Sequence, residues 1–274
     1  MARKALCVGI NKYPYPDTDL RGCVNDAKAW SRLLVDHYDF ADTDVRLLLD
    51  GQADYKSLSS ALKRLVQGAA PGDVLVFANA SHGTYDYDDA DDEPDGIDEA
   101  ICPFDCMENL LYDDELRELF AEIPVGVSLT VISDSCHSGT VTRAVLEPED
   151  PDAPDALIDC RVRFLNPIYR GKEPLHSPGR LAKKGDEKYP EEGMLEILLA
   201  GCTAEQESHD DKFSTQYHGG MTYYALQAIT AANYAITWSQ LLDRITPRLA
   251  LRYKGTQTPQ LEGKQANKDK QVFG

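Results

Sequence analysis

The stretch that decides the fold is LTVISDSCHSG, residues 129–139. Its apolar, β-branched first half is typical of a buried strand in a parallel sheet, and the glycine marks the turn that follows. A second stretch has the same form, because the apolar run VLVF at 74–77 precedes Ser81-His82-Gly83. Loops at the carboxyl ends of parallel strands form the ligand crevice of such sheets. We therefore expect the thiol of Cys136 and the imidazole of His82 at the same sheet edge.

The remaining periodicity alternates between strands and helices. Further strands are predicted at 5–10, 44–49, 195–200 and, as an edge strand that tolerates Pro259, at 258–261; helices are predicted at 25–37, 55–66, from 113 onward, at 222–232, and at 238–249 with an interruption at Pro247. This alternation predicts an α/β fold with a single, mostly parallel six-stranded sheet and helices on both faces.

The pattern fails between residues 146 and 192, which are rich in Pro, Asp and Lys. We interpret this stretch as an exposed linker. Residues 1–145 and 193–274 on either side are expected to form one domain together, because 274 residues suit one large α/β domain.

Composition excludes several function classes. The net charge of −18 argues against nucleic-acid binding and favours basic peptides or cations, although a well-solvated surface would explain the charge equally well. No apolar stretch has the length of a membrane span, and the N-terminus does not resemble a signal peptide, so a soluble cytoplasmic protein is expected. The seven cysteines lack zinc-type pairs: Cys102 and Cys106 have no second pair, which favours reduced thiols.

A thiol and an imidazole at one sheet edge are the components of a cysteine nucleophile with a histidine base. His82 can lower the pKa of the Cys136 thiol and later protonate a leaving amine. The backbone N–H groups of Gly83 and Cys136 are the expected oxyanion donors. Either residue alone would more often be structural, and we interpret His137 as structural.

These motifs resemble a known family. SHG at 81–83 and DSCHSG at 134–139 are similar to the histidine and cysteine motifs of metacaspases and orthocaspases, within the caspase-like cysteine peptidases. Similar family segments are GCVNDA at 22–27, DGIDE at 95–99, DDE at 113–115, LAGC at 199–202, GMTY at 220–223 and QTPQL at 257–261. The resemblance implies a caspase-like fold, with 1–145 similar to the large subunit and 193–274 to the small subunit. It also implies an endopeptidase that cleaves protein or peptide substrates after Arg or Lys.

The resemblance places Cys23, Asp26 and Asp134 in the primary specificity pocket. Two carboxylates at the base of a pocket suit a guanidinium, which binds them more strongly than the point charge of lysine does. Taken without the motif, Asp26 and Asp134 would be interpreted as acids at a helix start and a strand end. Ala80 stands where the family usually has serine.

Many metacaspases need calcium, and their ligand segments match Asp95 or Asp98 together with Asp113 and Asp114. A dense set of acids suits this hard cation, but Arg143 stands where the family has a further acid. A plain solvated acidic loop is the alternative.

The linker is rich in Arg and Lys, so an Arg- or Lys-selective enzyme is expected to cut itself within 143–188. A basic linker that only balances an acidic surface is the alternative. We expect a monomer. Two other functions stay open: a non-catalytic interaction module of the same fold, and an Asp-selective peptidase, which Arg21 near Cys23 would favour.

Overall fold

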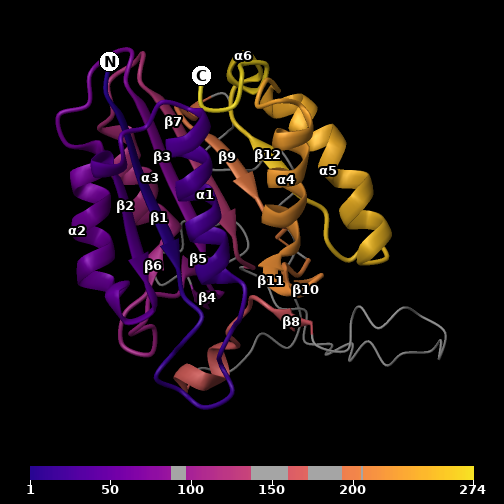
Figure 1. Ribbon diagram of the computed structural model, residues 1–274. Coiled ribbons are helices and arrows are strands. Elements are labelled where there is room, and N and C mark those ends of the chain that lie inside the picture. Colours follow the sequence, from indigo (N-terminus) through magenta and orange to yellow (C-terminus); the bar gives the residue numbers. More distant parts are fainter. Residues whose placement is uncertain (88–96, 137–159, 172–192, 205) are drawn as a thin grey trace.

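The computed structural model describes residues 1–87, 97–136, 160–171, 193–204 and 206–274. Its centre is a six-stranded sheet in the order β12-β9-β7-β3-β1-β2. The strands are β1 (Arg3–Gly9), β2 (Val45–Leu49), β3 (Val74–Ala80), β7 (Ser128–Asp134), β9 (Ile197–Ala200) and β12 (Gln260–Glu262). All neighbouring strands are parallel except β12, which runs antiparallel to β9. The predicted mostly parallel six-stranded sheet is confirmed (Figure 1).

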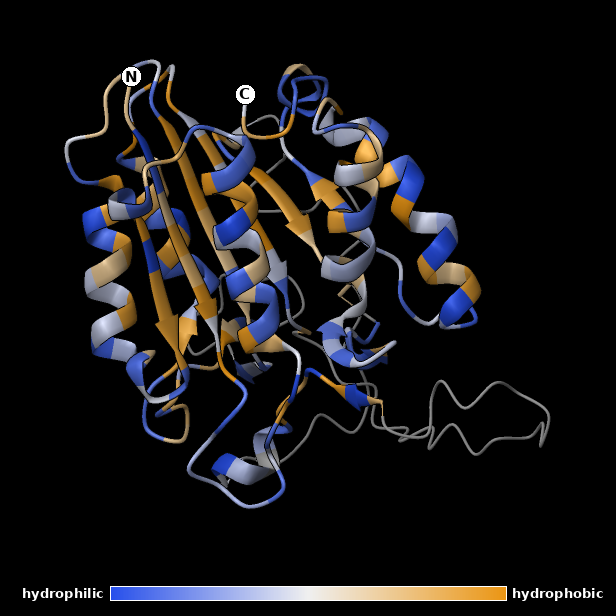
Figure 2. Ribbon diagram, in the orientation of Figure 1, coloured by the Kyte–Doolittle hydropathy of each residue, from blue (hydrophilic) through white to orange (hydrophobic). Residues whose placement is uncertain are grey.

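Helices cover both faces of this sheet, as predicted. They are α1 (Cys23–His37), α2 (Tyr55–Val66), α3 (Asp113–Ala121), α4 (Gly220–Ala231), α5 (Trp238–Arg252) and the short α6 (Gln265–Lys268). Alternate residues of β1 point to opposite faces: Ala5 and Cys7 pack with α1, α4 and α5, whereas Leu6 and Val8 pack with α2 and α3. The strands are therefore apolar on both sides, which Figure 2 shows as a hydrophobic central layer. None of the helices in the described part of the chain is long and apolar enough to span a membrane.

The expected break at Pro247 is wrong, because α5 continues through this residue from Trp238 to Arg252. The helix begins with a capping box, in which the side chains of Thr237 and Gln240 each accept a hydrogen bond from the backbone N–H of the other residue. Its apolar face, which includes Leu241 and Leu249, is fully buried. This burial keeps the helix formed despite the hydrogen bond that proline cannot donate.

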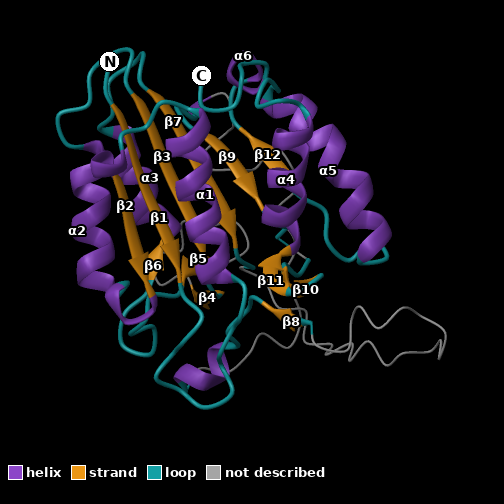
Figure 3. Ribbon diagram, viewed as in Figure 1, coloured by secondary structure: helices purple, strands orange, loops and turns teal. Residues whose placement is uncertain are grey.

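Two small sheets, which the sequence patterns did not predict, lie at the carboxyl ends of the central strands (Figure 3). One contains β4 (Gly83–Tyr87), β5 (Ile97–Ile101) and β6 (Leu111–Tyr112); the other contains β8 (Arg161–Val162), β10 (His209–Phe213) and β11 (Gln216–Gly219). Short 3₁₀ turns lie at Asp42–Asp44, Asp50–Gln52 and Pro167–Arg170. Together the two sheets enclose the edge at which β3 and β7 end.

Residues 160–171 correct one expectation. They belong to the stretch 146–192 interpreted as an exposed linker, yet Arg163 is 0% exposed and Leu165 only 2% exposed. β8 adds to the edge of β10 as an antiparallel strand. Part of this stretch is therefore packed into the body of the protein, at the same sheet edge as the histidine and cysteine motifs. The division into residues 1–145, 146–192 and 193–274 stays a prediction.

Candidate active site

The parallel pairing of β3 and β7 brings the two motifs together. Ala80 and Asp134 are partners at the ends of these strands, and His82 and Cys136 each follow two residues later. Both side chains are buried. The Cys136 sulfur accepts a hydrogen bond from the backbone N–H of Ser208, and it lies 3.9 Å from the sulfur of Cys202. The sheet therefore places the predicted nucleophile and base at one edge.

A backbone carbonyl orients the His82 ring. Its Nε2 atom lies 2.7 Å from the carbonyl oxygen of Thr18, which accepts the ring N–H in the matching tautomer. The other ring nitrogen, Nδ1, makes no well-formed hydrogen bond with the described residues. Sequence reasoning found no orienting group, because a carbonyl acceptor carries no side-chain signature. The arrangement leaves Nδ1 as the nitrogen that can accept a proton.

Burial lowers the pKa of His82 to about 4. The hydrogen bond to the Thr18 carbonyl and the negative charge of Asp210 oppose this lowering of the pKa, whereas the positive charge of Arg163 adds to it. The imidazole is consequently neutral at neutral pH. A neutral ring can act as a base, which a charged ring cannot.

The two expected oxyanion donors converge on one atom. The backbone N–H groups of Gly83 and Cys136 both donate to the carbonyl oxygen of Arg163, over 3.0 and 3.2 Å. A pair of N–H groups aimed at one carbonyl oxygen is the geometry that stabilises the oxyanion of acyl transfer. This carbonyl belongs to the chain's own buried segment.

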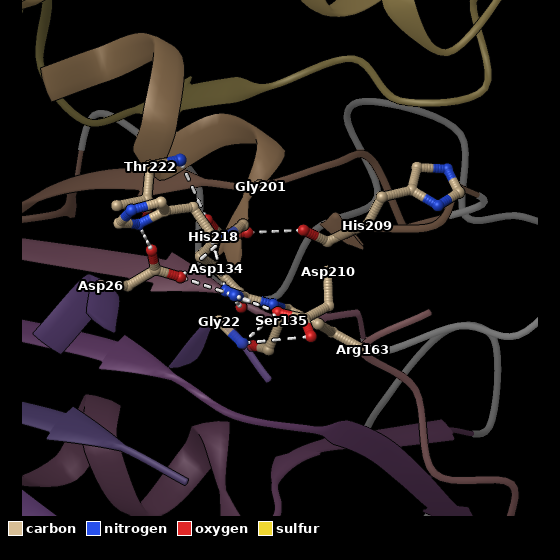
Figure 4. A network of polar contacts seen from close by, with 12 residues as sticks. Gly22, Asp26, Asp134, Ser135, Arg163, Gly201, His209, Asp210, His218 and Thr222 are labelled. Carbon is tan, nitrogen blue, oxygen red and sulfur yellow. Dashed lines mark hydrogen bonds and ion pairs between the residues drawn. The ribbon is translucent and has the colours of Figure 1, made fainter. Parts of the chain in front are cut away.

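The guanidinium of Arg163 lies among three carboxylates, as Figure 4 shows. Its nitrogens are 2.5 Å from Asp26, 2.9 Å from Asp210 and 3.4 Å from Asp134, and all four side chains are 0–1% exposed. Asp26 and Asp134 are the two acids that the resemblance placed in the specificity pocket. The sequence did not predict the third acid, Asp210, because it lies outside all the segments that resemble the family.

The three carboxylates also accept hydrogen bonds from backbone and side-chain donors. Asp26 accepts from the N–H of Gly219 and pairs with His218 over 2.8 Å. Asp210 accepts from Gly22 N–H, among other donors. Asp134 accepts from the Ser208 hydroxyl and the Thr222 N–H.

Close packing leaves no room for a side chain at Gly219. A Cβ there would lie 2.2 Å from an Asp134 oxygen and 2.5 Å from an Arg163 nitrogen. Cys23, the third residue that the resemblance assigns to the pocket, is fully buried and clusters with Leu20 and Ala80. Burial also raises the pKa of the Cys23 thiol, so this residue stays neutral. The negative charge of the pocket comes from its three aspartates.

Residues 161–165 cross this site as an extended segment. β8 pairs with β10, and the Arg163 N–H donates to the carbonyl of Ser208 over 2.9 Å. On the other side of Arg163, the Leu165 N–H donates to the carbonyl of Gly83 over 2.9 Å. Peptide recognition by strand addition uses main-chain bonds of this kind.

The predicted calcium ligands do not gather among the described residues. Asp113 and Asp114 begin α3, and their carboxylates pair with Arg117 over 2.6 and 2.9 Å. Asp98 lies in β5, whereas Asp95 is outside the described residues, as are Arg143 and His137. No group of three or more acidic, histidine or cysteine side chains in the described part of the chain could hold a metal ion. Calcium binding stays a prediction.

Comparison with known proteins gives a consistent family. A model described as "Metacaspase, peptidase C14 domain" matches residues 3–144. Metacaspase-4 from Arabidopsis thaliana is 41% identical over 145 residues, which are 51% of this chain and 34% of that protein. Metacaspase-1 from Arabidopsis thaliana is 30% identical over 263 residues, 92% of this chain and 65% of that protein. Metacaspase-1A from Neurospora crassa is 32% identical over 285 residues, 94% of this chain and 62% of that protein. The chain therefore spans between about a third and two thirds of these relatives.

A solved structure shares the fold. The crystal structure of a protein from Geobacter sulfurreducens superposes with a TM-score of 0.71, covering 100% of this chain and 98% of the other. The two sequences are 23% identical, so this likeness concerns the fold alone.

Proposed function

The chain belongs to the metacaspase family, and we propose that it is a cysteine endopeptidase that cleaves peptide bonds after arginine, with Cys136 as nucleophile and His82 as base. One observation carries the proposal. The carbonyl of Arg163 receives the N–H groups of Gly83 and Cys136 while its guanidinium lies among three aspartates. A substrate arginine in the same place would present its carbonyl oxygen to the same two N–H groups, one of which belongs to Cys136.

The chemistry follows from these positions. The Cys136 sulfur attacks the carbonyl carbon and His82 Nδ1 takes the thiol proton, while the two N–H groups stabilise the oxyanion. The carbon–nitrogen bond breaks as His82 returns the proton to the leaving amine, which leaves a thioester on Cys136. Water, deprotonated by His82, then hydrolyses the thioester and regenerates the thiol.

The pocket supports arginine over lysine in the first subsite. Two nitrogens of the Arg163 guanidinium reach three different carboxylates at once. A lysine ammonium is one point charge and cannot span them in the same way. The same three carboxylates would repel an aspartate, which disfavours the Asp-selective alternative.

We also propose that the chain cuts itself between Arg163 and Phe164, within the predicted range 143–188. Residues 161–165 lie in the place that a substrate would occupy, so cleavage within the chain would precede cleavage of other proteins. Until it is cut, this segment keeps substrates out of the pocket.

Calcium activation remains a proposal from the family resemblance, and so do a monomeric state and a cytoplasmic location. A cation at the start of α3 would have to compete with Arg117 for Asp113 and Asp114. No step of the chemistry above depends on it.

The test uses the full chain and its Cys136→Ala variant, each with and without calcium. Fluorogenic peptides with Arg before the scissile bond should be cleaved fastest, and peptides with Lys there more slowly. Peptides with Asp there should not be cleaved. Intact-mass analysis should show a cut after Arg163 in the wild type only, and an Arg170→Ala control should still be cut there. A wild type as inert as Cys136→Ala would favour the non-catalytic interaction module instead.

A further inference from the structure

We infer that the enzyme also selects the two residues after the scissile bond, an aromatic side chain first and a leucine-sized aliphatic side chain second. This inference rests on the proposed cleavage after arginine and extends it. Phe164 and Leu165 of the chain occupy these two positions, and both are held by β4 (Gly83–Tyr87).

The backbone of this segment is fixed on both sides of the bond that would break. Gly83 donates its N–H to Arg163 and accepts the N–H of Leu165, so Phe164 pairs with Gly83 as a parallel β-bridge. The hydroxyl of Thr84, which is fully buried, donates to the Leu165 carbonyl over 2.7 Å. These bonds involve only peptide groups of the segment, so any substrate sequence could form them and be placed in the same register.

Register along β4 then determines which side chain meets the first residue after the cut. Tyr85 stands two positions beyond Gly83, on the same side of the strand. Its ring stacks on that of Phe164, with centroids 5.9 Å apart and planes at 25°. Tyr85 itself is only 5% exposed, so the ring is a fixed surface. Aromatic pairs of this kind contribute beyond the area they bury, which an alanine in the first position would forfeit.

The second position is apolar and deep. Leu165 is 2% exposed and belongs to the hydrophobic cluster that contains Ile101 and Cys102. A polar or charged side chain there would be buried without a partner. A substrate is therefore expected to combine a basic residue, an aromatic residue and an aliphatic residue, in that order.

The experiment uses the autoprocessed wild type with internally quenched peptides. The reference is Arg-Val-Arg-Phe-Leu-Asn, the chain's own sequence at 161–166. Two others replace its Phe or its Leu by Ala. We expect kcat/KM to fall about two- to tenfold without the Phe, the range typical of an aromatic pair, and about tenfold or more without the Leu. Tyr85→Ala should abolish the difference in kcat/KM between the Phe and Ala peptides, whereas Tyr85→Phe should keep it.

The outcomes distinguish a failure of this inference from a failure of the proposed function. Equal rates on the three peptides would overturn the inference and leave cleavage after arginine intact, and so would a preference for Phe that survives in Tyr85→Ala. No cleavage of any arginine peptide would refute the proposed function itself. If Tyr85→Ala does not fold, the rate at which the chain cuts itself between Arg163 and Phe164 supplies the same test. Phe164→Tyr should be processed at the wild-type rate and Phe164→Ala more slowly, and equal rates for both would overturn the inference.

Discussion

Arg163 and Asp26 form an ion pair of 2.5 Å in which neither side chain is exposed to solvent. The pair joins α1, near the N-terminus, to a segment that follows β7 by about thirty residues. The guanidinium also pairs with Asp134 at the end of β7 and with Asp210 in β10. A charge this deep is tolerated only because its partners are equally buried and are held by hydrogen bonds. The segment is therefore fixed by the same contacts that would recognise a substrate.

Replacing Arg163 should affect both processing and stability. Arg163→Ala would leave three buried carboxylates without their cation, and breaking a buried pair costs about 3–5 kcal/mol. We expect no cut between positions 163 and 164, and a lower free energy of unfolding for this substitution in a Cys136→Ala background. Intact-mass analysis and urea denaturation measure the two effects. Arg163→Lys should restore part of both. Wild-type stability in Arg163→Ala would contradict the placement of the guanidinium.

Gly219 should be indispensable to the arginine pocket. A methyl group there would meet Asp134 and Arg163 at less than van der Waals distance, although the backbone conformation, with φ −67° and ψ 139°, is open to any residue. Gly219→Ala should therefore reduce kcat/KM on arginine peptides by about a hundredfold or more through steric loss of the pocket. Gly193→Ala is the matched control, because a Cβ at Gly193 meets nothing within 4 Å. Similar kinetics for both variants would show that the pocket tolerates the added methyl group.

Calcium, if it acts at α3, should compete with Arg117. This arginine bridges Asp113 and Asp114 within the first turns of the helix. Arg117→Ala would remove its ion pair with each carboxylate, so we expect a lower calcium concentration at half-maximal activation than in the wild type. Isothermal titration and activity titration both measure this. Asp113→Asn should shift the response the other way. Identical calcium responses in all three proteins would place any calcium site elsewhere.

The sheet was predictable because its strands are apolar on both faces, a pattern that few other structures produce. The parallel order of β3 and β7 then placed His82 and Cys136 at the same sheet edge. Asp210 was not predictable in the same way, because it reaches the pocket through the pairing of β10 with β11 and β8, whose strands are short and polar. The burial of Arg163 was not predictable from the sequence for a related reason. An arginine in a stretch rich in Pro and Lys is expected to be exposed, and only the three acids contributed by distant segments make the burial of Arg163 favourable.

Two buried histidines should make stability depend on pH. Burial lowers the pKa of His82 and of His209 to about 4, whereas the unfolded value is near 6.5. Between these values the unfolded chain binds protons that the folded protein does not. The stabilisation is therefore complete above about pH 6.5 and declines as the pH falls towards 4, by up to about 1.4 kcal/mol per pH unit for each histidine.

Urea denaturation of Cys136→Ala at pH 6.5 and pH 5.0 measures this slope. Adding His209→Gln removes one titrating ring, whose stacking partner is Tyr253 at 4.5 Å, and leaves His82 in place. The double variant should be less stable at both pH values because the stacking changes, but its free energy of unfolding should fall less between them. The difference between the two slopes isolates His209 from every other titrating group. A slope that does not change would mean that His209 is protonated in the folded protein as readily as in the unfolded chain.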